Sequence, residues 1–159
     1  MGEKNDYYAI TFFYDKKYIH PFIDIQLQIK QPPEKTGNVT INIINNHEVR
    51  GIVDTGATFC GITSRTVIRM GLTSKGEEDL ISATGKHSSP VYLFDVIFPD
   101  NKIFKNIEAV EISDAHSFDF LIGMNILSQG DMAITNTDEK MVFTFRMPSS
   151  GKYIDFENE

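Results

Sequence analysis

The sequence predicts an all-β fold, a closed barrel or sandwich with one or two short helices. Several short stretches alternate apolar and polar residues, the period of half-buried strands. Clusters of Gly, Pro, Asn and Asp separate these stretches at close spacing, which is typical of small barrels and sandwiches. Hydrophobic residues make up 41% of the 159 residues, enough for one buried core.

The first predicted strands lead towards an acidic turn. Every second residue from 23 to 29 is apolar, and two consecutive prolines follow shortly after. Apolar residues alternate again over residues 39–43, and we expect a hairpin in which residues 45–47 form the turn and residues 49–53 the returning strand. This strand ends at Asp54.

The remainder of the chain gives a similar pattern. Ser64 can cap a short helix that Gly71 ends. The other predicted elements are a long hairpin over residues 80–98, a turn at 99–102, strands at 103–112 and 118–122, a short helix at 124–128, and a last hairpin over residues 132–145.

No linker or internal repeat separates domains, so we predict one domain over residues 23–147. Residues 1–22 form an N-terminal extension rich in Tyr and Phe, and residues 148–159 form a C-terminal tail. The aromatic extension is expected to complete a sheet or to contact a second copy of the chain. A stripe that binds another partner is the alternative.

The segment from Val53 to Thr58 carries the candidate chemistry. An apolar strand that ends in Asp54-Thr55-Gly56 places one carboxylate at a tight turn, with a hydroxyl beside it. Hydrolysis of an amide without a metal or a nucleophile requires a general base and a general acid. Two close carboxylates that share one proton can fill both roles. Since the chain has one Asp-Thr-Gly, the second carboxylate would come from another copy.

Two motifs together resemble the signatures of retropepsin-like aspartic proteases, in particular their bacterial single-domain members. They are Asp54-Thr55-Gly56-Ala57-Thr58 and Phe120-Leu121-Ile122-Gly123, and the resemblance extends over residues 38–145. It implies a two-fold symmetric homodimer that cuts peptide bonds in an extended polypeptide. Asp54 would be catalytic, and the loop around it would be supported by Thr55, Gly56, Ala57 and Thr58, with Leu121, Ile122 and Gly123 packed beside it.

The resemblance also implies a flap, a hairpin that closes over the substrate. The polar stretch over residues 85–90 suits a mobile tip, where a glycine lets main-chain amides approach the substrate. The flap residues expected from this comparison are Ala83, Thr84, Gly85 and Lys86. His87 lies beside them and could make binding depend on pH.

Three other hypotheses stay open at this point. Asp54 could be an ordinary turn residue, since Asp-Thr-Gly is good turn chemistry. The chain could also be a catalytically silent dimer of the protease fold that binds peptides or proteins. Finally, the motif superficially resembles the phosphate loop of actin-like kinases, although the chain is short for that two-lobed fold.

The composition of the chain limits the kinds of molecule that it is expected to bind. A net charge of −7 disfavours nucleic-acid binding, which depends on clustered Lys and Arg. Cys60 is the only cysteine, which rules out an intramolecular disulfide, and we interpret it as a small buried thiol and not a nucleophile. No cofactor or metal is expected. An acidic N-terminus and no long apolar run favour a cytoplasmic protein without a membrane partner.

Overall fold

The computed structural model describes residues 7–30, 34–36, 39–41, 44–82, 85–115 and 117–157. It divides the chain into two compact units. The central unit is Phe22–Ile126, and the terminal unit combines Met1–Pro21 with Leu127–Glu159. The domain boundaries expected from the sequence, at residues 22/23 and 147/148, stay a prediction.

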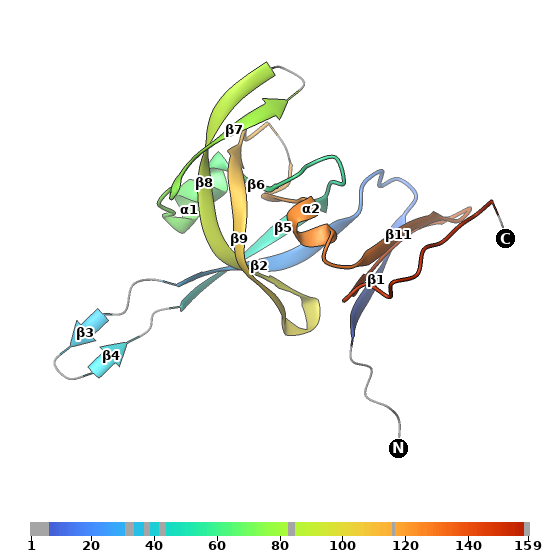
Figure 1. The fold of residues 1–159 in the computed structure, drawn as a ribbon, viewed down its shortest axis with the longest axis horizontal. Coiled ribbons are helices and arrows are strands. Elements are labelled where there is room, and N and C mark those ends of the chain that lie inside the picture. Colours follow the sequence, from blue (N-terminus) through green and yellow to red (C-terminus); the bar gives the residue numbers. More distant parts are fainter. Residues whose placement is uncertain are drawn as a thin grey trace. The chain divides into compact units, whose positions relative to one another are not determined.

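The structure is mostly β, with short helices between strands (Figure 1). Its elements are β1 (Tyr8–Asp15), β2 (Phe22–Lys30), β3 (Glu34–Thr36), β4 (Val39–Ile41), β5 (Ile44–Val53), β6 (Cys60–Thr63), α1 (Ser64–Met70), β7 (Gly76–Ser82), β8 (Gly85–Phe98), the 3₁₀ turn η1 (Pro99–Asn101), β9 (Lys102–Ile112), β10 (Phe120–Ile122), α2 (Met124–Leu127), β11 (Asp131–Asn136) and β12 (Lys140–Met147).

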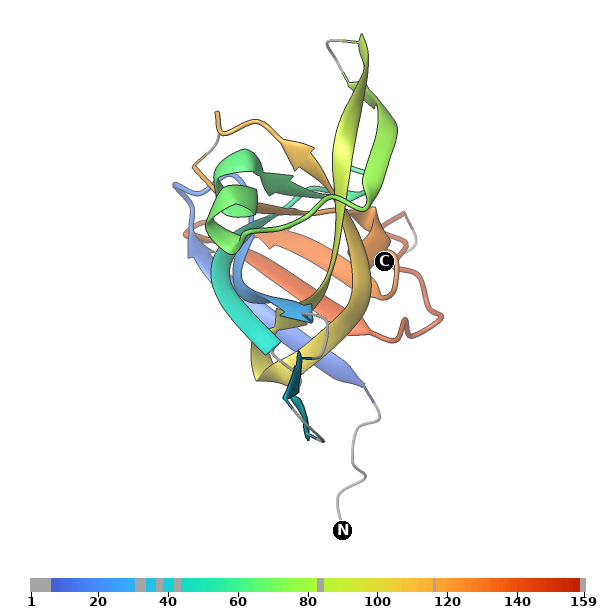
Figure 2. The ribbon, with the colours of Figure 1, turned by 90° about the vertical axis from the view of Figure 1, so that its left-hand side faces the viewer.

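The central unit is a closed six-stranded barrel, as the sequence predicts. Its strands follow the order β2-β5-β10-β6-β9-β8, and pairing of β2 with β8 closes the ring. Among the described strands, β7 pairs with β8 alone, and the resulting hairpin projects away from the barrel (Figure 2). Apolar side chains fill the interior, among them the fully buried Leu27, Ile62, Val96, Phe120 and Ile122.

The turn predicted at residues 45–47 is wrong, because these residues lie inside β5. Strand β5 pairs antiparallel with β2, with His47 opposite Leu27 and Asn46 opposite Gln28. The Asn46 side chain accepts a hydrogen bond from the Gln28 amide across the strands, at 3.0 Å. Cross-strand pairing over the whole length of β2 therefore outweighs the local turn preference of asparagine. Strand β4 pairs with β3 instead.

The short helix α1 forms where it is predicted, and Gly71 ends it in the left-handed conformation, with φ 61°. The predicted cap is wrong by one residue. Thr63 occupies the N-cap position, and its side chain makes no capping hydrogen bond. The Ser64 hydroxyl donates instead to Glu111 on β9, at 2.6 Å. The barrel brings the Glu111 carboxylate close to Ser64. The Ser64 hydroxyl therefore donates to this carboxylate and does not form the helix cap that the local sequence predicted.

The terminal unit is a three-stranded antiparallel sheet in the order β1-β12-β11. The aromatic N-terminal segment forms its edge strand β1, with Ile10 opposite Phe145 and Phe12 opposite Phe143. Ile10, Phe143 and Phe145 are buried on one face of this sheet. The segment therefore completes a sheet, and its expected contact with a second copy stays a prediction.

The remaining predicted elements form close to their expected positions: the hairpins β7–β8 and β11–β12, the turn η1, strands β9 and β10, and helix α2. Within the described part of the chain, no helix combines the length and apolar character needed to cross a membrane.

Truncating Phe120 tests the barrel core. This side chain is fully buried and packs edge-to-face on Phe94, with ring centroids 5.9 Å apart. We expect Phe120→Ala to lower the free energy of unfolding by about 3–5 kcal/mol, because it leaves a cavity that the strands cannot close. Urea unfolding followed by circular dichroism measures this. Phe13→Ala, at a side chain 66% exposed, is the control and should change little; equal losses would contradict the assignment of the core.

Candidate active site

Asp54 follows the last residue of β5 and is held mainly by its backbone. Its N–H donates to the carbonyl of Ile122, at 3.1 Å. Its carboxylate Oδ1 accepts the N–H of Gly56, at 2.8 Å, which closes a tight turn. The Asp54 side chain is half-buried, whereas Thr55 and Gly56 are exposed. One carboxylate is thus fixed in direction and reachable from solvent.

Strand β10 places the second motif beside this turn. It runs between two strands that flank the Asp54 loop, parallel to β5 and antiparallel to β6. Leu121 lies opposite Ile52, and Ile122 lies opposite Val53. Gly51 is needed for this fit, because a Cβ there would lie 2.9 Å from the Ile122 side chain. The structure therefore brings together the predicted loop and its predicted partners.

Gly123 allows the backbone after β10 to approach the loop closely. A Cβ at this position would lie 2.3 Å from the carbonyl oxygen of Phe59, a distance that no side chain can tolerate. Because the two backbones are this close, the N–H of Met124 donates to Ala57 at 2.8 Å, and the N–H of Asn125 donates to Thr58 at 3.1 Å. Helix α2 thus holds the far side of the loop through its first amides.

Asn125 adds side-chain contacts that sequence reasoning missed. Its Oδ1 accepts the Cys60 N–H and the Cys60 thiol, both at 3.0 Å. Its Nδ2 donates to the Glu108 carbonyl on β9, at 2.9 Å. The available signal was one polar side chain in the otherwise apolar run from residue 121 to 127.

Cys60 is a buried thiol, as predicted. It is fully buried, and burial raises its pKa to about 12, partly offset by the hydrogen bond that the Gly123 N–H donates to its sulfur. A neutral, inaccessible thiol is a poor nucleophile. Cys60 therefore belongs to the packing behind the loop.

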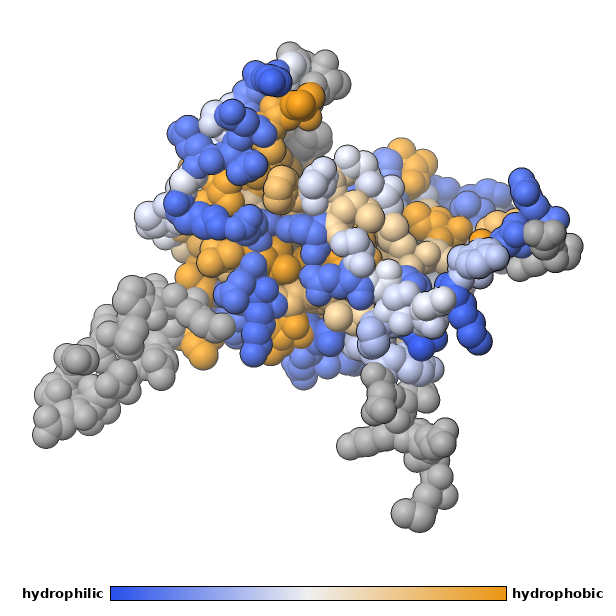
Figure 3. Space-filling view, in the orientation of Figure 1, coloured by the Kyte–Doolittle hydropathy of each residue, from blue (hydrophilic) through white to orange (hydrophobic). Residues whose placement is uncertain are grey.

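The predicted flap is the hairpin β7–β8. Lys86 pairs with Ile81, and Gly85, with φ 117°, pairs with Ser82. Ala83 and Thr84 lie outside the described residues, and the expected flap role of all four residues stays a prediction. In the space-filling view the hairpin is largely hydrophilic, with hydrophobic surface near its end (Figure 3). Ile81 is 81% exposed, which leaves an apolar side chain free to meet a ligand.

A hydrogen-bonded group fixes the base of this hairpin. Glu111 on β9 accepts the hydroxyl of Tyr92 and, from α1, that of Ser64, both at 2.6 Å. The Ser89 hydroxyl donates to the Glu111 carbonyl, at 2.7 Å. Burial, together with the Glu111 carboxylate, raises the pKa of Tyr92 to about 12, so its phenol stays protonated. The hairpin is thus anchored at its base and exposed along its outer half.

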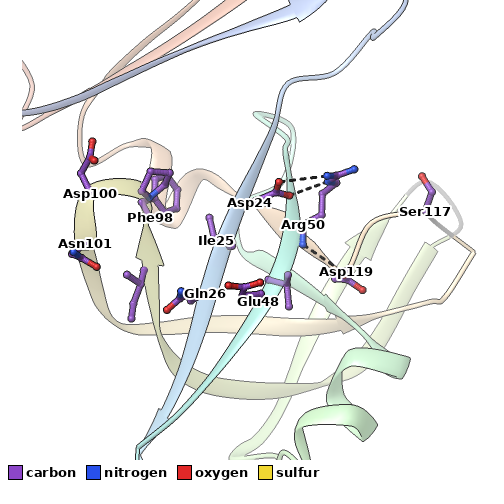
Figure 4. Close-up of a pocket in the computed structure, with 13 residues that line it drawn as sticks. Asp24, Ile25, Gln26, Glu48, Arg50, Phe98, Asp100, Asn101, Ser117 and Asp119 are labelled. Atoms are coloured by element: carbon purple, nitrogen blue, oxygen red, sulfur yellow. Dashed lines mark hydrogen bonds and ion pairs between the residues drawn. The ribbon is translucent and has the colours of Figure 1, made fainter.

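A pocket of about 680 Å³ lies elsewhere on the central unit (Figure 4). It is lined mainly by β2, β5 and the turn η1, and Arg50 pairs there with Asp24, at 3.0 Å. None of the predicted site residues lines it. Among the residues that the structure describes, no group of His, Cys, Asp and Glu could hold a metal ion.

Comparison with known proteins agrees with this architecture. The family model described as "gag-polyprotein putative aspartyl protease" matches residues 40–129, which include Asp54 and Gly123. The crystal structure of a retropepsin-like aspartic protease from Rickettsia conorii is similar, with a TM-score of 0.55 and 16% identity over 90% of this chain and 97% of that chain. The retroviral protease-like domain of Ddi1 from Leishmania major scores 0.42, with 16% identity over 80% of this chain and 95% of that chain. No curated protein matches the chain.

The fold is therefore retropepsin-like, and the chain belongs to the gag-polyprotein aspartyl protease family. The matched residues include five of the six barrel strands, β5, β6, β8, β9 and β10, together with helix α2, whereas the sixth barrel strand, β2, precedes them. Both sequence motifs that carried the resemblance lie within this range.

Gly123→Ala tests the close contact behind the loop. We expect a loss of about 3 kcal/mol or more in the free energy of unfolding, because the added methyl would overlap the backbone of Phe59. Gly61→Ala is the matched control, since its methyl would meet only side-chain atoms, the nearest at 3.1 Å on Ile112. Urea titration measures both, and equal stability of the two variants would contradict the contact.

Alkylation tests the state of Cys60. At a pH of about 8 the native protein should resist iodoacetamide, because the thiol is buried and its raised pKa of about 12 keeps it protonated. The same protein in urea should be modified completely within minutes, as mass spectrometry would show. Rapid modification of the native protein would mean that Cys60 is accessible.

Proposed function

We propose that the protein is an aspartic endopeptidase that acts as a homodimer. The observation that carries the proposal is the Asp54 turn, in which the Gly56 N–H donates to a reachable carboxylate and the Ile122 carbonyl accepts the backbone N–H of Asp54. Membership of an aspartyl protease family supports the same reading. Asp54 is the proposed catalytic residue, and residues 55–58 and 121–123 form its support.

The proposed chemistry needs two copies of the turn. Two carboxylates within about 3 Å hold one proton between them, because both cannot comfortably be ionised together. The ionised member takes a proton from a water molecule, which attacks the peptide carbonyl, while the protonated member gives its proton to the carbonyl oxygen. As the C–N bond breaks, the carboxyl group that took the proton from water passes it to the leaving nitrogen, and the other carboxylate takes its proton back from a hydroxyl of the tetrahedral intermediate. Each chain supplies one carboxylate, and Thr55 and Gly56 are exposed where a second copy would meet it.

The proposed substrate is an extended polypeptide. It would add as a strand beneath the hairpin β7–β8, with its backbone held by main-chain groups and alternate side chains in pockets. The exposed outer half of the hairpin and its anchored base suit a lid that opens and closes. Gly85 and Lys86, with Ala83 and Thr84, are the proposed flap residues.

Asp54→Asn tests the proposal. The amide oxygen can still accept the Gly56 N–H, so the fold should be retained, but the variant lacks the general acid and base. We expect cleavage of an unbiased peptide pool across about pH 4 to 8 to fall by at least roughly 10²–10⁴-fold. Cut sites are read by mass spectrometry, and circular dichroism checks the fold.

Asp138→Asn is the control for loss of one carboxylate, since this residue is exposed in the terminal unit. It should cut like the wild type. Equal cleavage by Asp54→Asn would overturn the proposed role of Asp54. If the wild type cuts nothing, yet binds peptides equally with and without the Asp54 carboxylate, the chain is a silent binding module of the protease fold.

A further inference from the structure

We propose that Glu111 on β9 is a positioning residue for the hairpin β7–β8, and that its contacts set how readily this hairpin opens for substrate. The catalytic part of the inference rests on the proposed function. The structural part rests only on contacts within the central unit, which join Glu111 to β8 and to α1.

Strand β8 leaves the barrel at one defined level. Its pairing with β9 begins with Val91 opposite Val110. Among the described strands, residues 85–90 of β8 pair with β7 alone. Pro90 has no N–H and cannot donate to a neighbouring strand, which weakens the ladder here. On β7, Gly76 lies opposite Val91, and glycine restricts the backbone least. Both strands of the hairpin therefore bend most easily at this level.

Glu111 holds β8 on both sides of this level through side-chain hydrogen bonds. Its carboxylate accepts the Tyr92 hydroxyl, at 2.6 Å, on the barrel side. Its main-chain carbonyl accepts the Ser89 hydroxyl, at 2.7 Å, just beyond Pro90 on the hairpin side. The other carboxylate oxygen accepts the hydroxyl of Ser64, the first residue of α1, at 2.6 Å. One residue of β9 thus joins the base of the hairpin to a helix of the barrel.

The two contacts to β8 are made by buried side chains. Ser89 and Tyr92 are both buried, so a hydroxyl that lost its partner would keep the cost of having left water. Hydrogen bonds to a carboxylate are also stronger than those between neutral groups. Burial, together with the Glu111 carboxylate, raises the pKa of Tyr92 to about 12, so the phenol keeps the proton that it donates. Separating either side chain from Glu111 would therefore cost free energy.

Beyond these contacts the hairpin can move as one unit. Its two strands pair from Gly76 and Val91 outwards to Ser82 and Gly85. The Ser88 hydroxyl also donates to the Glu77 carboxylate across the strands, at 3.0 Å. Residues 77–79 and 85–88 are exposed. Opening at the base would thus leave the hairpin itself intact, and the Glu111 contacts are among the interactions that it would break.

Tyr92→Phe gives the sharpest test, because it removes one hydroxyl and keeps the buried ring. A hydrogen bond to a charged group is strong enough to change an opening equilibrium roughly 10- to 100-fold. We expect amide hydrogen exchange in residues 76–82 and 85–91 to rise by this factor relative to the wild type, and exchange in β5 to stay unchanged. Ser89→Ala, which removes the contact on the hairpin side, should act in the same direction. Tyr153→Phe is the matched control, at a side chain 87% exposed.

The catalytic consequence is a change in KM and not in kcat. A hairpin that opens more easily holds substrate less tightly, whereas the Asp54 turn keeps its own backbone contacts. For a peptide that the wild type cuts, the KM of Tyr92→Phe should rise at least roughly 5-fold, with kcat within about 2-fold of the wild type. Tyr153→Phe should match the wild type in both constants.

The outcomes separate this inference from the proposed function. Unchanged exchange of the hairpin in both Tyr92→Phe and Ser89→Ala would overturn the role of Glu111. An equal rise in β5 and in the hairpin would mean that these contacts stabilise the whole barrel, and the positioning role would be wrong. A fall in kcat at unchanged KM would also contradict it. If the wild type cuts no peptide but exchange rises in the hairpin alone, the positioning role stands and the protease proposal fails.

Discussion

The close approach of Gly123 to Phe59 is the contact on which the rest of the site depends. Because no Cβ intervenes, the chain leaving β10 runs directly against the chain entering β6. Two backbone amides of α2 then reach the carbonyls of Ala57 and Thr58. The loop is therefore held from behind by main-chain groups, which leaves Thr55 free on the outer side. Because backbone hydrogen bonds hold the loop, the side chains of Thr55 and Thr58 are not needed to fix its position.

A second polar centre on the central unit, at Asp119, is also held through backbone hydrogen bonds. Asp119, just before β10, accepts the backbone N–H of Arg50 on β5, and its carbonyl accepts the N–H of Thr63 on β6. Its ion pairs with Arg65 and Arg69 are partly exposed, with N–O distances of 3.6 Å, so they add little. The strands around Asp54 are thus joined at both ends of β10, whereas the hairpin β7–β8 is anchored only at its base. The proposed catalytic loop is therefore held more firmly than the proposed flap.

The sequence predicted the features that local pattern determines. Alternating apolar residues located β2, turn signals on either side located β9 and β12, and Gly71 located the end of α1. The prediction failed where a distant partner overrides local preference: Asn46 pairs across to Gln28 instead of turning the chain, and Ser64 bonds to Glu111 instead of capping α1. Asn125 could not be assigned for the same reason, since its partner Glu108 lies on another strand. The motifs identify the candidate catalytic group, but the side chains that support its loop come together only in the closed barrel.

The single carboxylate has a consequence for how activity would be controlled. One carboxyl group cannot serve as base and acid in the same step, so a lone chain holds half of the proposed machinery. All the support described above lies within one chain, and it prepares the Asp54 turn before any second copy arrives. Association would then only have to align two turns that are already ordered. Less conformational entropy would be lost when the dimer forms. Activity of the proposed enzyme would therefore follow the fraction of chains in the dimer, and protein concentration itself would act as a regulator.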